Sequence, residues 1–137
     1  MRRVALAALA AAALAAAGCG GDDDKDKVRE TVQAYVDSFV KGDAARTCSL
    51  MTEETRREFV KGARPLAPTS DCATATIAVR AAAGRKAIDA LRDAKISKVT
   101  IQGNSASARL KASSGESVAT LTKKGGEWKV SSAPGSQ

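Results

Sequence analysis

Residues 99–112 read VTIQGNSASARLKA, and this stretch decides the fold. Along 105–112, alanine and leucine alternate with serine, arginine and lysine, which is the period of a strand with one buried face. Gly103 and Asn104 mark a turn between this segment and the apolar residues before it. The stretch therefore predicts a β-hairpin formed by residues 95–102 and 105–112.

Two more strands are predicted downstream. Ser, Ser and Gly at 113–115 mark a turn before a strand over 116–123, and Lys-Gly-Gly at 124–126 marks another before a strand over 127–131. Strands joined by such short turns form an antiparallel meander.

Upstream of the meander, the apolar residues recur at helical spacing. One face of a helix from about residue 26 to 41 is formed by Val28, Val32, Tyr35, Val36, Phe39 and Val40. Gly42 ends this helix, and further helical segments follow with N-caps at Asp43, Thr52 and Ser70 or Asp71, the last broken at Gly84. Helices followed by a meander predict an α+β fold in which the helices cover one face of the sheet.

The composition limits the size of the core and the chemistry available. The chain has 137 residues, 3% aromatic residues and no histidine, so we expect one small domain with a thin core of Val, Ile, Leu and Ala. The absence of histidine argues against a Ser-His-Asp triad, and we expect no metal and no cofactor. The net charge of +7 is spread along the chain and identifies no partner. Few aromatic side chains are present for stacking on bases, so we do not expect the protein to bind nucleic acid.

The N-terminus has the features of an export signal. Two arginines precede an unbroken Ala, Leu and Val run at 4–17. A helix of that length spans about 21 Å, which is shorter than the ~30 Å hydrocarbon core, so residues 1–18 are predicted to be a signal peptide. The segment LAAAGC at 14–19 is similar to a bacterial lipobox, in which the cysteine is diacylated and becomes the new N-terminus. Cys19 is therefore the predicted lipidation site, and ordinary cleavage that leaves a free thiol is the alternative.

An acidic tract follows this cysteine directly. The sequence GGDDDKDK at 20–27 combines glycines with a dense charge run, which favours a solvated tether over a packed element. We expect residues 19–27 to be a lipid-anchored charged linker that holds the domain on the outer, extracytoplasmic face of the cell membrane. A calcium loop would need spaced ligands and a turn glycine between them, which this tract lacks.

Three cysteines are an odd count for an exported chain. Lipidation of Cys19 leaves Cys48 and Cys72, which meet an oxidising compartment. A bridge between them closes a loop of ~25 residues and contributes roughly 3.5 kcal/mol on the chain-entropy model. The alternative is a redox or nucleophilic cysteine, but neither residue has a CxxC neighbour and no histidine is present as a base. We favour the structural disulfide.

The chain resembles the nuclear-transport-factor-2-like superfamily, particularly its secreted actinobacterial lipoproteins. The resemblance rests on VRETVQAYVDSFVKGDAARTCSLMTEETRREF at 28–59, on VTIQGNSASARL at 99–110 and on the closing GGEWKV at 125–130. It implies a domain over 28–132, with 133–137 as a disordered tail, and a curved four-stranded sheet wrapped around the first helix. It also implies a conical pocket between helix and sheet. The residues that we expect at this pocket are Tyr35, Phe39 and Trp128.

Tyr35 carries the main enzymatic hypothesis. Ketosteroid isomerases share this fold, and the resemblance implies that Tyr35 would donate a hydrogen bond to an oxyanion. That chemistry also needs a carboxylate base and a second acid. The segment RREFVKG at 56–62 offers Glu58 or Phe59 near the position of the base and no aspartate, and the meander offers no second acid. The leading hypothesis is therefore a non-enzymatic lipoprotein that binds a small apolar ligand or an envelope protein through its cone pocket or sheet face, and an isomerase-like enzyme is the alternative.

Overall fold

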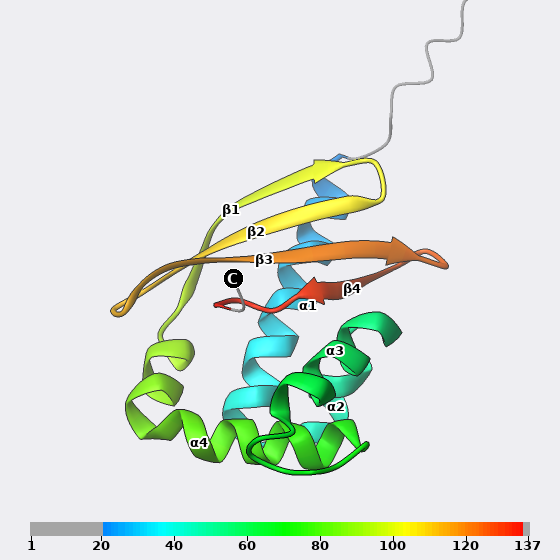
Figure 1. Ribbon diagram of the computed structural model, residues 1–137. Helices are drawn as coiled ribbons and strands as arrows, with labels where there is room; N and C mark the ends of the chain where they lie inside the picture. Colours follow the sequence, from blue (N-terminus) through cyan, green and yellow to red (C-terminus); the bar gives the residue numbers. More distant parts are fainter. Residues whose placement is uncertain (1–20, 136–137) are drawn as a thin grey trace, which may run out of the picture.

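The computed structural model describes residues 21–135 and has the predicted α+β architecture (Figure 1). The predicted signal peptide at 1–18 and Cys19 lie outside the described residues. Within 21–135, no helix is long and apolar enough to cross a membrane. In chain order, the elements are α1 (Asp22–Lys41), α2 (Ala44–Ser49), α3 (Glu53–Ala63), α4 (Cys72–Arg92), β1 (Lys95–Gln102), β2 (Ser105–Ala112), β3 (Gly115–Lys124) and β4 (Glu127–Ser132).

The four strands form one antiparallel sheet in the order β1-β2-β3-β4, as the meander predicted. The connection between α2 and α3 covers the free edge of β4. The Val130 amide donates to the Leu50 carbonyl at 2.7 Å, and the Thr52 amide donates to the Val130 carbonyl at 2.9 Å. These bonds occupy the edge of β4 at Val130 and so shield the middle of the strand from pairing with another chain.

The predicted helix caps are present. The Asp43 side chain accepts from the Arg46 amide at 3.1 Å, and the Asp71 side chain accepts from the Thr74 amide at 2.8 Å. Thr52 caps α3 in the same way. These bonds satisfy amides that a helix leaves unpaired in its first turn. The predicted break in α4 also occurs, because Gly84 has φ 78° and is not helical.

The core lies between α1 and one face of the sheet, with α4 packed against the C-terminal part of α1 (Figure 1). The alternation along 105–112 is confirmed, since Ala106, Ala108 and Leu110 are buried and their neighbours in sequence are not. The other buried residues of the core are Val28, Val32, Tyr35, Val36, Phe39, Val40, Met51, Ile88, Ala94, Val99, Ala119, Leu121, Trp128 and Val130.

The acidic tract is part of the fold, and the prediction of a solvated linker is wrong for residues 22–27. These residues form the first turns of α1, and Asp24 is only 8% exposed. Lys123 and Trp128, about 100 residues further along the chain, both donate hydrogen bonds to the Asp24 carboxylate. These partners compensate the cost of burying the charge, so the segment packs despite its composition.

The predicted tail is also partly wrong. Ala133 packs against the hydrophobic core, and Pro134 is half-buried. Residues 136–137 lie outside the described residues. The folded domain therefore runs from Asp22 to at least Ala133, rather than from 28 to 132.

Candidate ligand-binding grooves

A groove of about 710 Å³ opens between α3, the β3–β4 hairpin and the C-terminal segment. We call it the α3 groove. Its lining residues are Thr52, Glu54, Thr55, Glu58, Phe59, Gly62, Ala63, Val79, Thr122, Lys124, Ser131, Ser132 and Ala133. The groove therefore combines one helix, two strands and a single residue of α4.

The lining of the α3 groove divides into an apolar part, hydroxyl groups and charges. Its aromatic side chain is Phe59, which packs against the hydrophobic core together with Val79. Hydroxyl groups come from α3, β3 and β4, and the exposed charged side chains are those of Glu54, Glu58 and Lys124. Such a mixture suits a small ligand with an apolar face and a few polar edges.

Thr55 holds α3 against β4 at this groove. Its hydroxyl donates to the Ser131 carbonyl at 3.0 Å and also shares a hydrogen bond with the Thr52 hydroxyl at 2.7 Å. The register of β3 against β4 shifts here, so that Thr120 faces Ser132 while Leu121 faces Val130. Ser131 is thus the extra residue of a bulge, and a bulge redirects the backbone groups of the strand. This irregularity makes the Ser131 carbonyl available to α3.

A second groove, of about 820 Å³, lies between the C-terminal half of α4 and the β2–β3 hairpin, and we call it the α4 groove. Small residues dominate its lining, and the larger apolar side chains are Leu91 and Leu110. Pro134 and Gly135 also line the α4 groove, while Ala133 lines the α3 groove. The α4 groove has no aromatic side chain, so it offers a flat ligand little to stack on.

The three residues that the sequence placed at a pocket lie in the core. Tyr35, Phe39 and Trp128 are 6%, 9% and 4% exposed, and none of them lines the α3 groove or the α4 groove. Trp128 does line a smaller groove, of about 320 Å³, together with residues of α1 and with Arg46 of α2. Burial raises the pKa of Tyr35 to about 12, so its hydroxyl stays protonated even above pH 10. Trp128 donates from Nε1 to Asp24 at 3.2 Å. These side chains fill the space between α1 and the sheet, and the two grooves open beside it.

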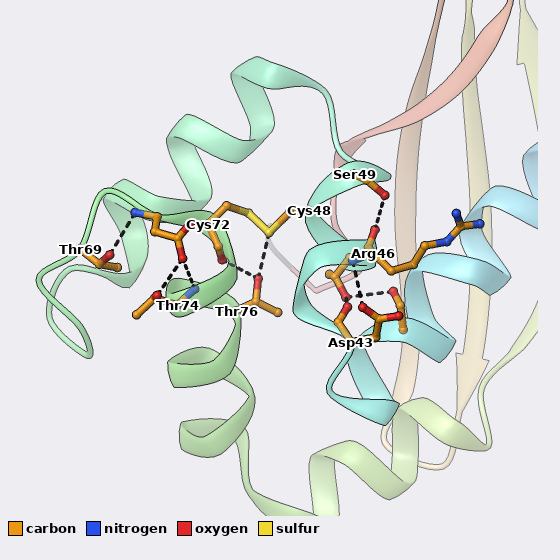
Figure 2. Close-up of a disulfide and its surroundings, with 11 residues drawn as sticks. Asp43, Arg46, Cys48, Ser49, Thr69, Cys72, Thr74 and Thr76 are labelled. Atoms are coloured by element: carbon orange, nitrogen blue, oxygen red, sulfur yellow. Dashed lines mark hydrogen bonds between the residues drawn. A yellow bond between two sulfur atoms is a disulfide. The ribbon is translucent and has the colours of Figure 1, made fainter.

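Cys48 and Cys72 form the predicted disulfide, with an S–S distance of 2.04 Å (Figure 2). The bond joins α2 to the first residue of α4. Thr76 packs against it, with its hydroxyl donating to the Cys72 carbonyl at 2.8 Å and lying 3.4 Å from Cys48 Sγ. The pairing accounts for both sulfur atoms, so neither is a free nucleophile in this structure.

The described part of the chain contains no candidate metal site. Within residues 21–135, no group of three or more histidine, cysteine, aspartate or glutamate side chains is placed to hold a metal ion. The acidic residues of the first turn of α1 are instead engaged with the sheet through Asp24 or exposed to solvent.

A comparison with protein families agrees with this architecture. The model of a family described as "Putative lumazine-binding" matches residues 23–133, which is most of the chain. The chain belongs to this family. The lumazine-binding family is part of the nuclear-transport-factor-2-like superfamily, so the resemblance seen in the sequence is confirmed at the level of the superfamily. No curated protein and no solved structure matches the chain significantly.

The match to the lumazine-binding family begins one residue after the start of α1, which agrees with the acidic tract being part of the domain. The sequence did not reveal the α3 groove. Thr55, Thr122 and Ser131 lie on three different elements, and nothing in their spacing indicates that they converge. The one signal in the sequence that could have pointed to this groove is Phe59, an aromatic residue on a short amphipathic helix.

Proposed function

We propose that this protein is a lipid-anchored, extracytoplasmic binding protein that holds a small planar heterocycle in the α3 groove. The observation that carries the proposal is the position of Phe59 in a groove that also contains hydroxyl groups from Thr55, Thr122 and Ser131. The description of the family names lumazine, a flat ring system with carbonyl and amide edges. The ligand class proposed here has the same two features.

The dimensions and chemistry of the α3 groove fit such a ligand. A volume of about 710 Å³ lies in the range of small-molecule sites, about 300–1,000 Å³. An aromatic ring next to Phe59 gains from offset or edge-to-face packing, while the Thr122 hydroxyl can donate to a ring carbonyl. The Thr55 hydroxyl already donates to the Ser131 carbonyl, so its part is to fix the wall of the groove. Lys124 on β3 and Glu58 on α3 place opposite charges in the same groove. Charges of both signs can orient a polar substituent of the ligand.

Binding without catalysis is part of this proposal. An isomerase-like reaction would need the Tyr35 hydroxyl and a carboxylate to face the ligand together. In the described residues, Tyr35 lies in the core and no hydrogen bond links its hydroxyl to a carboxylate. These observations support a binding role and favour it over the enzymatic alternative.

The membrane anchor rests on the N-terminal sequence. The lipobox-like segment at 14–19 supports diacylation of Cys19, which would hold the protein at the outer face of the membrane. Two acyl chains anchor a protein stably where one chain does not. Intact mass measurement of the membrane fraction, compared with a Cys19→Ala chain, tests this part. A mature mass without added lipid would contradict it.

A titration of lumazine with the purified domain tests the ligand site. We expect the fluorescence of lumazine to change on binding to the wild type and the affinity of Phe59→Ala to be at least about fivefold weaker, because an aromatic contact is worth ~1 kcal/mol or more. Ile77→Ala is the matched control, since Ile77 is 60% exposed on α4 and lies outside the α3 groove. Equal affinities for the wild type and Phe59→Ala would contradict the assignment of the groove.

A further inference from the structure

The first turns of α1 are fixed to the sheet by a cluster of three side chains. Lys123 Nζ lies 3.1 and 3.2 Å from the two carboxylate oxygens of Asp24, and Trp128 Nε1 donates to the same carboxylate at 3.2 Å. Lys123 Nζ also lies 5.7 Å from the centre of the Trp128 ring, within the range of a cation–π contact. We call these three residues the Asp24 clasp. Because of the clasp, the start of α1 cannot move freely relative to the β3–β4 hairpin.

The tether between the predicted anchor and the folded domain is short. Only Gly20 and Gly21 separate Cys19 from Asp22, the first residue of α1. Three peptide steps span at most about 11 Å. By comparison, α1 has 20 residues and is about 30 Å long. The tether is therefore much shorter than the domain, and only one end of the domain can approach a membrane that holds Cys19.

That end of the domain is formed by the first turns of α1 and two turns of the sheet. The Lys123 amide donates to the Asn104 carbonyl at 2.8 Å, which brings the β1–β2 turn against the end of β3. Gly125 and Gly126 form the β3–β4 turn next to it. We call this surface the tethered end. Figure 1 shows the start of α1 beside the β1–β2 turn and α4 at the opposite end of α1.

The tethered end has a polar surface, which suits contact with lipid headgroups. Its exposed side chains are polar or charged, with acids such as Asp22 and Asp23 and a base, Lys124. The exposed large hydrophobic residues, Leu66 and Ile77, lie elsewhere, in the α3–α4 connection and on α4. A polar surface without apolar side chains has no driving force to enter the hydrocarbon layer. Contact with the membrane is thus expected at headgroup depth.

We propose that the tethered end lies against the lipid headgroups of the outer membrane face and that the Asp24 clasp sets this orientation. The inference rests on the lipid anchor at Cys19 proposed above. It assigns the β1–β2 and β3–β4 turns to the membrane side. It also places the disulfide, α4 and the β2–β3 turn on the side away from the membrane, where other envelope components can reach them.

Energy transfer from tryptophan tests this orientation, because Trp128 is the single tryptophan of the chain and belongs to the clasp. The full lipidated protein is reconstituted in phospholipid vesicles that contain a lipid with a dansyl headgroup. We expect efficient transfer from Trp128 to the dansyl group. A flexible Gly/Ser insertion of about 20 residues between Gly21 and Asp22, with a reach of about 25 Å, should reduce the transfer strongly.

A second variant places the donor at the opposite end of the sheet. Ser114→Trp in a Trp128→Phe background moves the donor to the exposed β2–β3 turn, and circular dichroism checks that the variant folds. Trp128→Phe removes one hydrogen bond of the clasp and leaves both contacts of Lys123 with the Asp24 carboxylate, so the start of α1 stays joined to β3. We expect less transfer from this position than from Trp128. These measurements use protein that is shown by its mass to be lipidated. In such protein, equal transfer from both donor positions would overturn the proposed orientation, and so would transfer that the insertion leaves unchanged. Protein that carries no lipid on Cys19 would overturn the anchor as well, so the two failures are distinguishable.

Discussion

The Lys123 ammonium group contacts both carboxylate oxygens of Asp24, and so ties the end of β3 to the first turn of α1 across 99 positions of the sequence. The hydrogen bond from Lys123 is the main cause that lowers the pKa of Asp24, and the bond from Trp128 adds to it. The charged form of Asp24 is therefore favoured in the folded state. This gives the domain a stability that depends on pH.

Asp24→Asn should lower the thermal midpoint at neutral pH, because the amide keeps the shape of the side chain but loses the charge. An Asp with a lowered pKa stabilises the fold above its unfolded value of ~4, and this contribution is lost as the pH falls through the folded value. The gap between wild type and variant should therefore be largest near pH 7 and narrow below about pH 4. Thermal melts followed by circular dichroism over this pH range measure it.

Asp26→Asn is the control for this prediction. Asp26 is exposed on the same helix, and its ion pair among residues 21–135 is with Arg29, at 3.3 Å. Exposed pairs of this kind contribute little to stability, so the variant should melt like the wild type. A pH-independent gap for Asp24→Asn, or an equal effect of both variants, would contradict the role of the clasp.

Tyr35 should lose its proton at a higher pH than an exposed tyrosine does. It is the single tyrosine of the chain, so the absorbance of tyrosinate reports on it alone. Burial raises its pKa to about 12, so the folded protein should hold the proton well above pH 10. The stability that this burial gives is present below about pH 10 and is lost as the pH rises toward the folded value. Protein unfolded in guanidinium is the control and should titrate near pH 10, and a folded protein that did the same would show that Tyr35 is exposed.

The disulfide should contribute substantially to stability in so small a domain. Cys48 and Cys72 are separated by 24 positions, and closing such a loop is worth about 3.5 kcal/mol on the chain-entropy model. A Cys48→Ala/Cys72→Ala double variant should lose an amount of this order in urea unfolding. The wild type under reducing conditions should unfold at the same urea concentration as the double variant. A change of less than about 1 kcal/mol would mean that helix packing alone holds α2 on α4.

Two glycines in helices should respond to alanine in opposite directions. Gly84, at the break in α4, has φ 78° and ψ 168°, a backbone region that is essentially restricted to glycine and costs an L-residue about 1–3 kcal/mol, so Gly84→Ala should destabilise the domain. Gly62 lies in α3 with helical geometry and with nothing within 4 Å of a Cβ, so Gly62→Ala should stabilise by about 0.5–1 kcal/mol. Urea unfolding of the two variants compares them. A stabilising Gly84→Ala would show that the break in α4 is not fixed.

Local signals predicted most of the fold correctly. The alternation along 105–112 and the caps Asp43 and Thr52 depend on neighbours in sequence, and the structure confirms each of them. The acidic tract at 22–27 was misassigned because its composition favours solvent, and its decisive partners, Lys123 and Trp128, come from the other end of the chain. The composition of the tract cannot show that Asp24 is paired with residues from a distant part of the chain.

The candidate site was harder to predict for a related reason. The predicted pocket residues are large and lie on the apolar face of α1 or on β4, and this is what makes them good core residues. The α3 groove depends instead on a bulge at Ser131 and on the hydrogen bond from Thr55 to its carbonyl. Both features arise from tertiary packing, and no pattern in the sequence marks them.

The most direct test of the account is a set of intermolecular nuclear Overhauser effects between lumazine and the labelled domain. We expect contacts from the ring protons of the ligand to the Phe59 ring and to the Ala63 methyl group, because both residues line the α3 groove. Ile77→Ala should keep these contacts and Phe59→Ala should lose them. Contacts to Leu91 and Leu110 of the α4 groove, or no contacts at saturating ligand, would contradict the central claim.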